Sequence, residues 1–533
     1  MCIDIFRHSV RFTSVNINIA IFAPANNSRR SLLTLFTDNK SNKKQGNGYN
    51  TKLSKFSTKH TMSASKHTAD VIIIGAGIIG TSTALHLARA GRKIIVIDKL
   101  AGPGLGSTSY SSGICRMFYS VLDSVKFSWE GYQYFTHWED FIGTSTKDSR
   151  GYAKLRECGG MVFQSKSTEE WVNKMVPLFE QVGVPHEKWD RKKLDNEFGL
   201  NSPFRMDFSS FGPPKRIDHE DFGTPVPNEE VTGALWVDRS GYVSDPNLAV
   251  LNMVLACETT ENTTFLYGHS VTKILRNDTD TKVTGVELSD GTLVSAPVVV
   301  NVAGPHSNQI TDLAFNEGAS KLNDMTITTK ALRQEVAYVN APPGMSGADH
   351  AYERKEKEGK VTLPMMGDVD AGIYFRPEVG GKILMGTTEP ECDHPLEYVE
   401  DPDNMNQSLT DNHTNYMYRL ALRIPEIRLP GSSDTQGIVA CYDVTEDWTP
   451  IYDKSLLGGY YMAIGTSGNQ FKNAGVAGAL MCELIEKCEN KKDDWDHDVE
   501  PLQFKLKYTG GTVDTKSFSR KRQVLDTTAS VLG

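Results

Sequence analysis

A glycine-rich turn between two apolar segments constrains the fold of this chain more than any other feature. Residues 71–74 (Val-Ile-Ile-Ile) form an unbroken β-branched run, which is typical of a strand buried on both faces of a parallel sheet. Three glycines follow this run at once: Gly75, Gly77 and Gly80. A helix-like segment then leads to a second apolar run at residues 94–98. This order of strand, glycine turn, helix and strand predicts a βαβ unit that binds a dinucleotide.

Each residue of the turn has an expected function. Gly75 permits the tight turn, Gly77 lets the backbone approach a pyrophosphate, and Gly80 lets the helix pack closely on the sheet. The backbone amides of Ile78 and Ile79 open the helix and would face the anion.

An acidic residue completes the pattern. Asp98 lies 23 residues after Gly75, close to the spacing of roughly 20 residues expected for a carboxylate that binds a ribose hydroxyl. Lys99 follows it and is included in the expected cofactor site. The loop at residues 102–113, which contains Ser107, is rich in glycine and serine. Its amides and hydroxyls can surround a phosphate or a cofactor ring.

Two later strands also run into glycine. Residues 298–304 form an apolar strand that ends at Gly304, and residues 461–468 form another that ends in a loop with Gly468. A helix is expected at residues 474–488. At both glycines the backbone could approach a cofactor closely.

Composition limits the class of protein. At 533 residues and 39% hydrophobic, the chain is long enough for two domains and tails. Its net charge of −9 argues against a nucleic-acid partner. It contains no run of 18 apolar residues, so we expect no transmembrane segment. Its eight cysteines show no metal-ligand spacing, so we expect reduced intracellular thiols and no metal site.

The N-terminal residues differ from the rest of the chain. The first 61 residues contain ten Lys or Arg and two Asp, which is the composition of a mitochondrial transit segment. A disordered extension, or a translation start at Met62, explains the same composition. We therefore expect residues 1–66 to be a disordered extension or a transit segment, and the protein to be mitochondrial or cytoplasmic.

The fingerprint at residues 75–80, Gly304 in mid-chain and the loop at residues 465–472, in this order, resemble the flavin-dependent glycine/D-amino-acid oxidase (DAO) family. The resemblance is greatest to its sarcosine-oxidase and dimethylglycine-dehydrogenase branch and covers roughly residues 69–490. It implies FAD rather than NAD, a choice that the fingerprint alone leaves open. It also implies an α/β (α+β) fold, in which a Rossmann-type FAD-binding domain carries an inserted antiparallel β-sheet substrate domain.

The resemblance also implies domain boundaries. The FAD-binding domain would be discontinuous and comprise residues 67–160, 232–315 and 440–490. The substrate domain would comprise residues 161–231 and 316–439, with residues 491–533 as a C-terminal tail.

Two cations match residues that bind the substrate carboxylate in sarcosine oxidases. Arg116 matches an arginine of their Arg-x-x-Arg block, and Lys472, at the end of residues 468–472, matches the lysine of their Gly-His-Gly-Phe-Lys loop. An arginine fork and a lysine that converge above a flavin would hold an amino-acid carboxylate and orient its C–H bond toward the ring. The resemblance therefore assigns both residues to the catalytic site.

The sequence also departs from this pattern. Leu384 stands where sarcosine oxidases have the lysine that promotes reaction with oxygen, Thr388 stands where they have a histidine, and Asn469 replaces the loop histidine. Loss of positive charge beside the flavin favours a dehydrogenase over an oxidase. Lys382 lies two residues before Leu384 and would share its face of a strand, so it could replace the missing lysine.

Covalent attachment of the flavin is not expected. The segment at residues 440–445 resembles the one that carries the flavin-linked cysteine, but Ala440 fills the cysteine position and Cys441 comes one residue late. A shift of one residue turns a strand side chain to the other face. The first Gly/Ser-rich loop offers Tyr110 and no histidine for the alternative linkage. We therefore expect non-covalent FAD.

These observations together predict an FAD-dependent oxidoreductase. It would oxidise the C–N bond of a small, N-substituted amino acid by hydride transfer to the flavin, with oxygen, a quinone or an electron-transfer flavoprotein as acceptor. Tyr119 and Tyr374 are candidate polar groups of the pocket. An FAD-dependent 2-hydroxy-acid dehydrogenase and a catalytically inactive flavin-binding assembly protein are the alternatives.

Overall fold

The computed structural model describes residues 66–143, 148–200, 202, 205–342, 363–431, 435–490 and 495–532. The expected extension or transit segment at residues 1–66 lies outside the described residues, except for Lys66. Within the described ranges, the helices are too short or too polar to cross a membrane.

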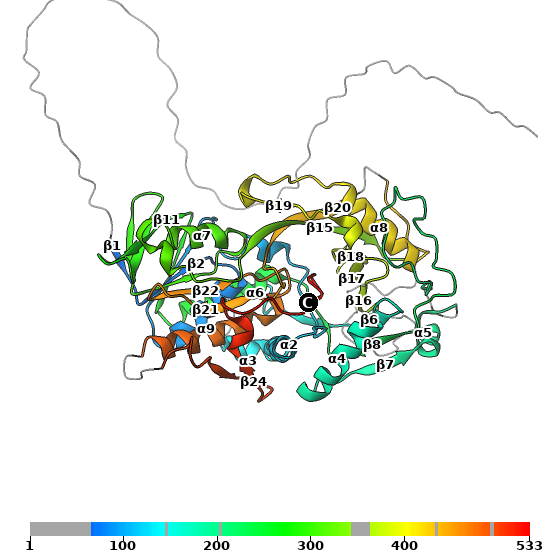
Figure 1. The fold of residues 1–533 in the computed structure, drawn as a ribbon, viewed down its shortest axis with the longest axis horizontal. Helices are drawn as coiled ribbons and strands as arrows, with labels where there is room; N and C mark the ends of the chain where they lie inside the picture. The colour runs from blue at the N-terminus through cyan, green and yellow to red at the C-terminus, as the bar shows by residue number, and fades with distance from the viewer. Residues whose placement is uncertain are drawn as a thin grey trace, which may run out of the picture. The chain divides into compact units, whose positions relative to one another are not determined.

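The predicted βαβ unit forms the centre of a mostly parallel sheet (Figure 1). It consists of β2 (Val71–Ile74), α1 (Ile78–Arg89) and β3 (Ile94–Asp98). The strand order is β10-β3-β2-β14-β22-β21, and only the β21–β22 pair is antiparallel. The added strands are β10 (Thr263–Tyr267), β14 (Val298–Asn301), β21 (Ile451–Lys454) and β22 (Tyr460–Ile464). This is the buried parallel arrangement that the apolar runs predict.

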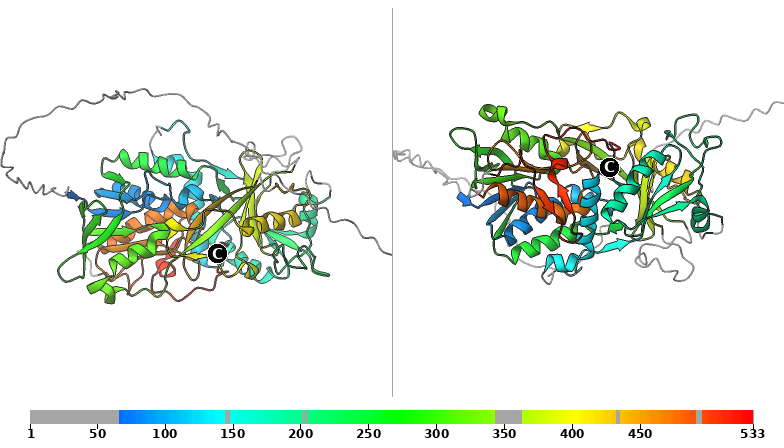
Figure 2. Two further views of the ribbon diagram at one scale, coloured as in Figure 1. Left: turned by 90° about the horizontal axis from the view of Figure 1, so that it is seen from above. Right: turned by 60° about the horizontal axis from the view of Figure 1, so that its bottom comes forward.

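Both faces of the parallel sheet are covered. Val71 and Ile73 face a core that includes α1, α6 (Pro246–Glu258) and α9 (Ala474–Cys488). Figure 2 shows these helices beside the sheet in two further views. Ile72 and Ile74 face the opposite core, which α7 (Ser307–Ala314) and a smaller sheet complete. That sheet has the order β1-β13-β12-β11, with β1 (Lys66–Thr68), β11 (Val271–Arg276), β12 (Val283–Leu288) and β13 (Leu293–Ser295).

Two segments differ from a simple interpretation of the sequence. Residues 293–300, which look like one strand, form β13 and β14 in separate sheets, because Pro297 between them has no amide for a ladder hydrogen bond. The charged segment at residues 168–195 contains a strand between its helices. Its parts are α4 (Glu169–Val182), β7 (Glu187–Asp190) and α5 (Arg191–Phe198). Gly183 ends α4 with a φ of +81°, which turns the chain out of the helix.

A second, larger sheet is mostly antiparallel and has the order β19-β15-β18-β17-β16-β6-β8-β7, with β20 also paired to β15. Its strands are β6 (Gly160–Gln164), β8 (Gly233–Val237), β15 (Lys330–Asn340), β16 (Met365–Asp368), β17 (Ile373–Glu378), β18 (Lys382–Thr387), β19 (Tyr398–Val399) and β20 (Gln436–Val444). Helix α8 (Asp411–Arg423) packs on it through an apolar face that includes Leu420. An α/β fold that joins a Rossmann-type unit to an antiparallel sheet agrees with the predicted fold class.

Two strands of the large sheet, β8 and β20, lie at or across the predicted domain boundaries. Strand β8 pairs with β6 and β7 of the large sheet, although the predicted boundary at residue 232 assigns it to the FAD-binding part. Strand β20 crosses the predicted boundary at residues 439/440 and runs from the large sheet to the cofactor cavity described below.

The remaining elements surround the junction of the two sheets. The aromatic segment at residues 117–142 contains α2 (Leu122–Thr136) and α3 (Trp138–Ile142). A small sheet joins β4 (Ile114–Cys115), β9 (Gly241–Val243) and β5 (Leu155–Glu157). The C-terminal residues add a hairpin of β23 (Gln503–Lys505) and β24 (Thr512–Asp514). Arg520 then fixes the following segment through buried ion pairs with Asp453 and with the partly buried Asp324 and Asp498.

Candidate active site

A cavity of about 490 Å³ lies at the carboxyl ends of β2, β3 and β14 and beside β20. This volume falls within the range of small-molecule and cofactor sites. All residues that the sequence assigned to cofactor binding line it: Gly75, Gly77, Ile78, Ile79, Gly80, Asp98, Lys99, Ser107, Gly304 and Gly468. Three regions far apart in the sequence, residues 75–107, Gly304 and Gly468, therefore meet at one cavity.

The three glycines of the first turn occupy different environments. Gly75 has a φ of +118°, and an added Cβ would lie 2.3 Å from the carbonyl oxygen of Val302. A Cβ on Gly80 would lie 2.0 Å from the carbonyl oxygen of Gly75, so only glycine permits this contact between helix and turn. Around Gly77 the nearest atom to an added Cβ is Thr108 Oγ1 at 3.3 Å. Gly77 nevertheless lines the cavity.

Asp98 is held in a fixed orientation. Its carboxylate accepts hydrogen bonds from the amides of Ala76 (2.7 Å) and Leu100 (2.8 Å), which links the end of β3 to the glycine turn. Across the cavity, the Ser107 hydroxyl donates a 2.8 Å hydrogen bond to the carbonyl of Cys441 in β20. The Gly/Ser-rich loop is thus tied to the large sheet at the lining of the cavity.

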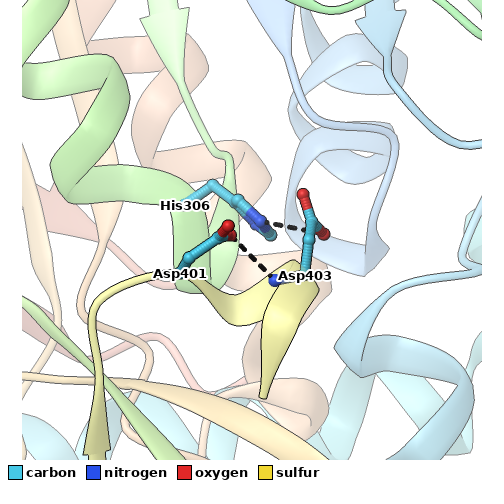
Figure 3. A group of neighbouring side chains, drawn as sticks. All are labelled: His306, Asp401 and Asp403. Carbon is cyan, nitrogen blue, oxygen red and sulfur yellow. Dashed lines mark hydrogen bonds and ion pairs between the residues drawn. The ribbon is translucent and has the colours of Figure 1, made fainter.

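A charged cluster lies at the edge of the cavity (Figure 3). His306 Nε2 lies 3.3 Å from a carboxylate oxygen of Asp403, whose amide donates to Asp401. This group of three could hold a cation. The ammonium of Lys99, however, lies 2.7 Å from His306 Nε2 and pairs with Asp403. Burial and the charge of Lys99 lower the pKa of His306. The ammonium of Lys99 therefore already provides a cation for Asp403.

Asp443 in β20 is a buried acid that the sequence analysis missed. It accepts a 2.6 Å hydrogen bond from the amide of Gly465, and its carbonyl accepts one from the amide of Ser467. Burial raises the pKa of Asp443 to about 7. It thereby holds the second glycine loop against the cavity. An acid within an otherwise apolar strand is the signal that could have predicted it.

The two predicted substrate cations line a small second cavity, of about 30 Å³. Arg116 and Lys472 come from segments more than 350 positions apart, yet both reach this space. The second cavity shares four lining residues with the first: Ser111, Ser112, Gly468 and Phe471. The cations therefore lie next to the cofactor cavity, as a substrate site requires.

Tyr119 joins the two cations. Lys472 Nζ donates 2.5 Å hydrogen bonds to the Tyr119 hydroxyl and to the carbonyl of Asn469. The Arg116 guanidinium carbon lies 4.7 Å from the centre of the Tyr119 ring, and Lys472 Nζ lies 4.9 Å from it. All of these groups are buried. The ring and its hydroxyl thus bring two positive charges together away from solvent.

The buried charges influence one another. Burial, assisted by the charge of Arg116, lowers the pKa of Lys472. Burial alone would raise the pKa of Tyr119, but the two nearby cations outweigh it and leave this pKa below its usual value. An anion bound here would relieve the repulsion between the cations.

The other predicted positions are also defined. Leu384 is buried in an apolar cluster with Tyr374 and Leu532, and Thr388 is buried. Lys382 starts β18 and donates a 2.5 Å hydrogen bond to Gln436. Among the described residues, Lys382 is not part of the lining of either cavity. It therefore does not supply the positive charge that Leu384 lacks.

Cys441 of β20 borders the cavity, but its thiol contacts Met405. Ile438, Ala440 and Tyr442 alternate along β20 and line the cofactor cavity. The Cys441 sulfur lies 3.1 Å from the sulfur of Met405. Burial raises the pKa of Cys441 to about 11, so its thiol is protonated and weakly nucleophilic near neutral pH.

The residues present fit a dinucleotide cofactor. Helix α1 begins at Ile78, directly after the glycine turn, so its N-terminal end lies at the cavity. The amide of Ile78 donates a 3.1 Å hydrogen bond to the Thr108 hydroxyl. Asp98 has acceptor capacity left for ribose hydroxyls. The turn around Gly77 would hold the pyrophosphate and Asp98 the ribose next to it.

Comparison with known proteins identifies the family. The pattern of the DAO family, described as "FAD dependent oxidoreductase", matches residues 70–484. The chain belongs to this family. The mitochondrial regulatory subunit of pyruvate dehydrogenase phosphatase from Mus musculus is 23% identical over 464 residues, which cover 85% of this chain and 44% of that protein. A D-amino acid dehydrogenase from Paramagnetospirillum magneticum is 46% identical over 43 residues, which are 8% of this chain and 10% of the relative. The chain thus spans less than half the length of either relative.

Solved structures share the fold. L-proline dehydrogenase from P. horikoshii has a TM-score of 0.60 at 18% identity, with 80% of this chain and 95% of that chain covered. Glycine oxidase from Bacillus cereus has a TM-score of 0.57 at 18% identity, with 82% and 98% covered. The resemblance to the DAO family and the predicted fold class are thereby confirmed.

Proposed function

We propose that this protein is an FAD-dependent oxidoreductase that removes a hydride from a carbon bonded to the nitrogen of a small, N-substituted amino acid. One observation carries the proposal: two buried cations, Arg116 and Lys472, lie on one aromatic ring beside the cavity that the predicted dinucleotide-binding residues line. Buried like charges are unfavourable unless an anion joins them. A substrate carboxylate is such an anion.

The protein groups would bind and orient the substrate. The Arg116 fork and the Lys472 ammonium would hold the carboxylate through charge-assisted hydrogen bonds. Because both cations are fixed by Tyr119, the bound substrate would keep one orientation relative to the cofactor cavity. FAD, when bound, supplies the hydride acceptor. The imine product would be hydrolysed by water.

A dehydrogenase is favoured over an oxidase. Leu384 is 1% exposed among apolar side chains, and Lys382 is bound to Gln436 instead of the cavity. These contacts support a site without the lysine that sarcosine oxidases use to stabilise reduced oxygen. The protonated thiol of Cys441 supports non-covalent FAD.

A regulatory or assembly protein that binds FAD without turnover is the second candidate. The mouse relative, which 85% of this chain matches, is named a regulatory subunit. This candidate predicts a flavoprotein that no amine reduces.

Anaerobic mixing of the flavin-loaded protein with panels of N-methyl amino acids, D-amino acids and 2-hydroxy acids tests these functions. Bleaching of the flavin absorbance by an N-methyl amino acid supports the proposal. Bleaching by 2-hydroxy acids alone would identify a hydroxy-acid dehydrogenase, and no bleaching by any compound would favour the regulatory protein. Arg116→Ala should raise the substrate concentration needed at least tenfold and keep the FAD, whereas Arg150→Ala, at a half-exposed side chain, should change neither.

The acceptor and the cellular location are further predictions. Re-oxidation of the bleached protein by oxygen, by a soluble quinone or by electron-transfer flavoprotein would identify the acceptor. Cell fractionation would distinguish the mitochondrial from the cytoplasmic location that the basic N-terminal residues suggest.

A further inference from the structure

The segment Thr527 to Leu532 covers the small cavity that contains the two cations. Val531 and Leu532 are 7% and 3% exposed and line this cavity together with Arg116. Upstream, the segment is anchored by Arg522, whose guanidinium pairs with the buried Asp447 at 2.8 Å. Figure 1 shows the red C-terminal segment running toward the junction of the two sheets.

Arg116 donates hydrogen bonds to main-chain oxygens, two of which belong to this segment. Its Nη1 donates to the carbonyls of Leu532 (2.9 Å) and Phe118 (2.8 Å), and its Nη2 donates to the carbonyl of Val531. These are the donors that would bind a carboxylate. The carbonyls of the segment therefore take the place of carboxylate oxygens.

The amide of Val531 has a partner on the opposite side. It donates a 2.9 Å hydrogen bond to Glu389 Oε2. One residue thus has its nitrogen bound to an acid and its carbonyl bound to Arg116. In a free α-amino acid the nitrogen and the carboxylate flank the α-carbon in the same way. The main chain of Val531 therefore has the polar pattern of an amino acid.

Glu389 is held in an unusual conformation. Its φ is +53°, in the left-handed region that side chains rarely adopt, and the hydroxyl of Thr387 accepts a hydrogen bond from its amide at 2.9 Å. Gln334 donates to its other carboxyl oxygen at 3.1 Å. Such strain persists only where surrounding contacts impose it, and it gathers at binding and catalytic sites. Burial raises the pKa of Glu389 to about 8, which a cationic nitrogen nearby would reverse.

We propose that Arg116 and Glu389 together bind the carboxylate and the nitrogen of an amino-acid substrate, and that the main chain of Val531 occupies this site as an internal pseudosubstrate. The inference rests on the proposed function and adds a residue that recognises the substrate nitrogen. Because one site has two competing occupants, the segment must leave before a substrate binds. Leu532, which packs against Gly367, is its apolar anchor.

The test measures binding, not turnover. The probe is 2-aminoisobutyrate, which has no hydrogen on its α-carbon and so cannot lose a hydride there. Pivalate, with a methyl group in place of the amine, is its matched analogue. Calorimetry with the flavin-loaded protein would give the affinity of each compound. The variants are Leu532→Asp, which expels the anchor, and Val531→Pro, which removes the donor to Glu389. Val524→Asp, at a side chain that is 60% exposed and lies three residues before this segment, is the control.

We expect Leu532→Asp and Val531→Pro to bind 2-aminoisobutyrate at least tenfold more tightly than the parent protein, and Val524→Asp to match the parent. Adding Glu389→Gln to Leu532→Asp should weaken the binding of 2-aminoisobutyrate at least tenfold and leave the affinity for pivalate unchanged. If neither Val531→Pro nor Leu532→Asp gains affinity, Val531 is not a competing occupant. If Glu389→Gln affects both compounds equally, or neither, Glu389 does not recognise the nitrogen.

These affinities, together with the bleaching experiment above, separate this inference from the proposed function. The expected binding pattern without bleaching by any N-substituted amino acid would overturn the oxidation and leave the amino-acid site in place. Bleaching without the expected effect of Glu389→Gln would keep the oxidation and overturn the inference.

Discussion

The ammonium of Lys472 donates a 2.5 Å hydrogen bond to the hydroxyl of Tyr119. The same tyrosine ring contacts Arg116, so a single aromatic side chain fixes the distance between the two cations. Lys472 and Tyr119 depend on each other, because a buried ammonium and a buried phenol each need a hydrogen-bond partner. Their combination forms a rigid receptor for an anion.

Removal of one cation tests this receptor. Lys472→Met should raise the KM for an amino-acid substrate about tenfold or more, since a hydrogen bond to a charged group contributes about 1.5–3 kcal/mol. FAD content, measured from the visible spectrum, should stay constant. Lys382→Met, outside the lining of both cavities, is the matched control. An unchanged KM in Lys472→Met would show that the carboxylate binds elsewhere.

Gly80→Ala tests the contact between helix and turn. Its Cβ would lie 2.0 Å from the carbonyl oxygen of Gly75, so α1 must move away from the turn that faces the cofactor. We expect a loss of about 1–3 kcal/mol in the free energy of unfolding and weaker retention of FAD on dialysis. Gly431→Ala meets no atom within 4 Å and should behave like the parent. Equal FAD retention in both variants would contradict the assignment.

Asp443 predicts a pH dependence of stability. Its pKa is about 7 in the folded protein and near 3.8 in the unfolded chain, so the folded state binds the proton more tightly. Its stabilising effect is complete below pH 4 and is lost as the pH rises to 7, by on the order of 4 kcal/mol. Asp443→Asn cannot ionise.

The measurement is the unfolding temperature between pH 4 and 8. The unfolding temperature should fall less with rising pH in Asp443→Asn than in the parent protein. In Asp140→Asn, at an exposed position, it should fall as much as in the parent. Parallel curves for the parent protein and Asp443→Asn would refute a raised pKa.

Acid precipitation tests how the flavin is held. With the Cys441 thiol protonated and in contact with Met405, we expect FAD to be released into the supernatant. Cys441→Ser should release the same amount. Colour that stays in the pellet of the parent and disappears from that of Cys441→Ser would instead identify a covalent bond.

Local patterns in the sequence predicted the first cavity well. The run at residues 71–74, Gly75, Gly80 and Asp98 are close in sequence, and their geometry follows from chain stereochemistry and strand burial. Ser107, Gly304 and Gly468 required the family resemblance. Their meeting at one cavity depends on β14 and β22 pairing beside β2.

Other features lay beyond sequence patterns. The pairing of β8 with the large sheet depends on which distant strand is available as a partner. Glu389 looks like an ordinary acid in the sequence, since its burial is a property of the folded chain.

The sequence by itself predicted the dinucleotide turn and its acid, because these depend on residue type and short spacing, and the family resemblance added the two cations. Only the tertiary structure decided that Tyr119 joins Arg116 to Lys472 and that Val531 lies between Arg116 and Glu389. The contacts of Lys472 with Tyr119 and of Val531 with Arg116 and Glu389 connect positions more than 140 residues apart. Such proximity arises from the packing of two sheets and a C-terminal segment, which no local pattern specifies.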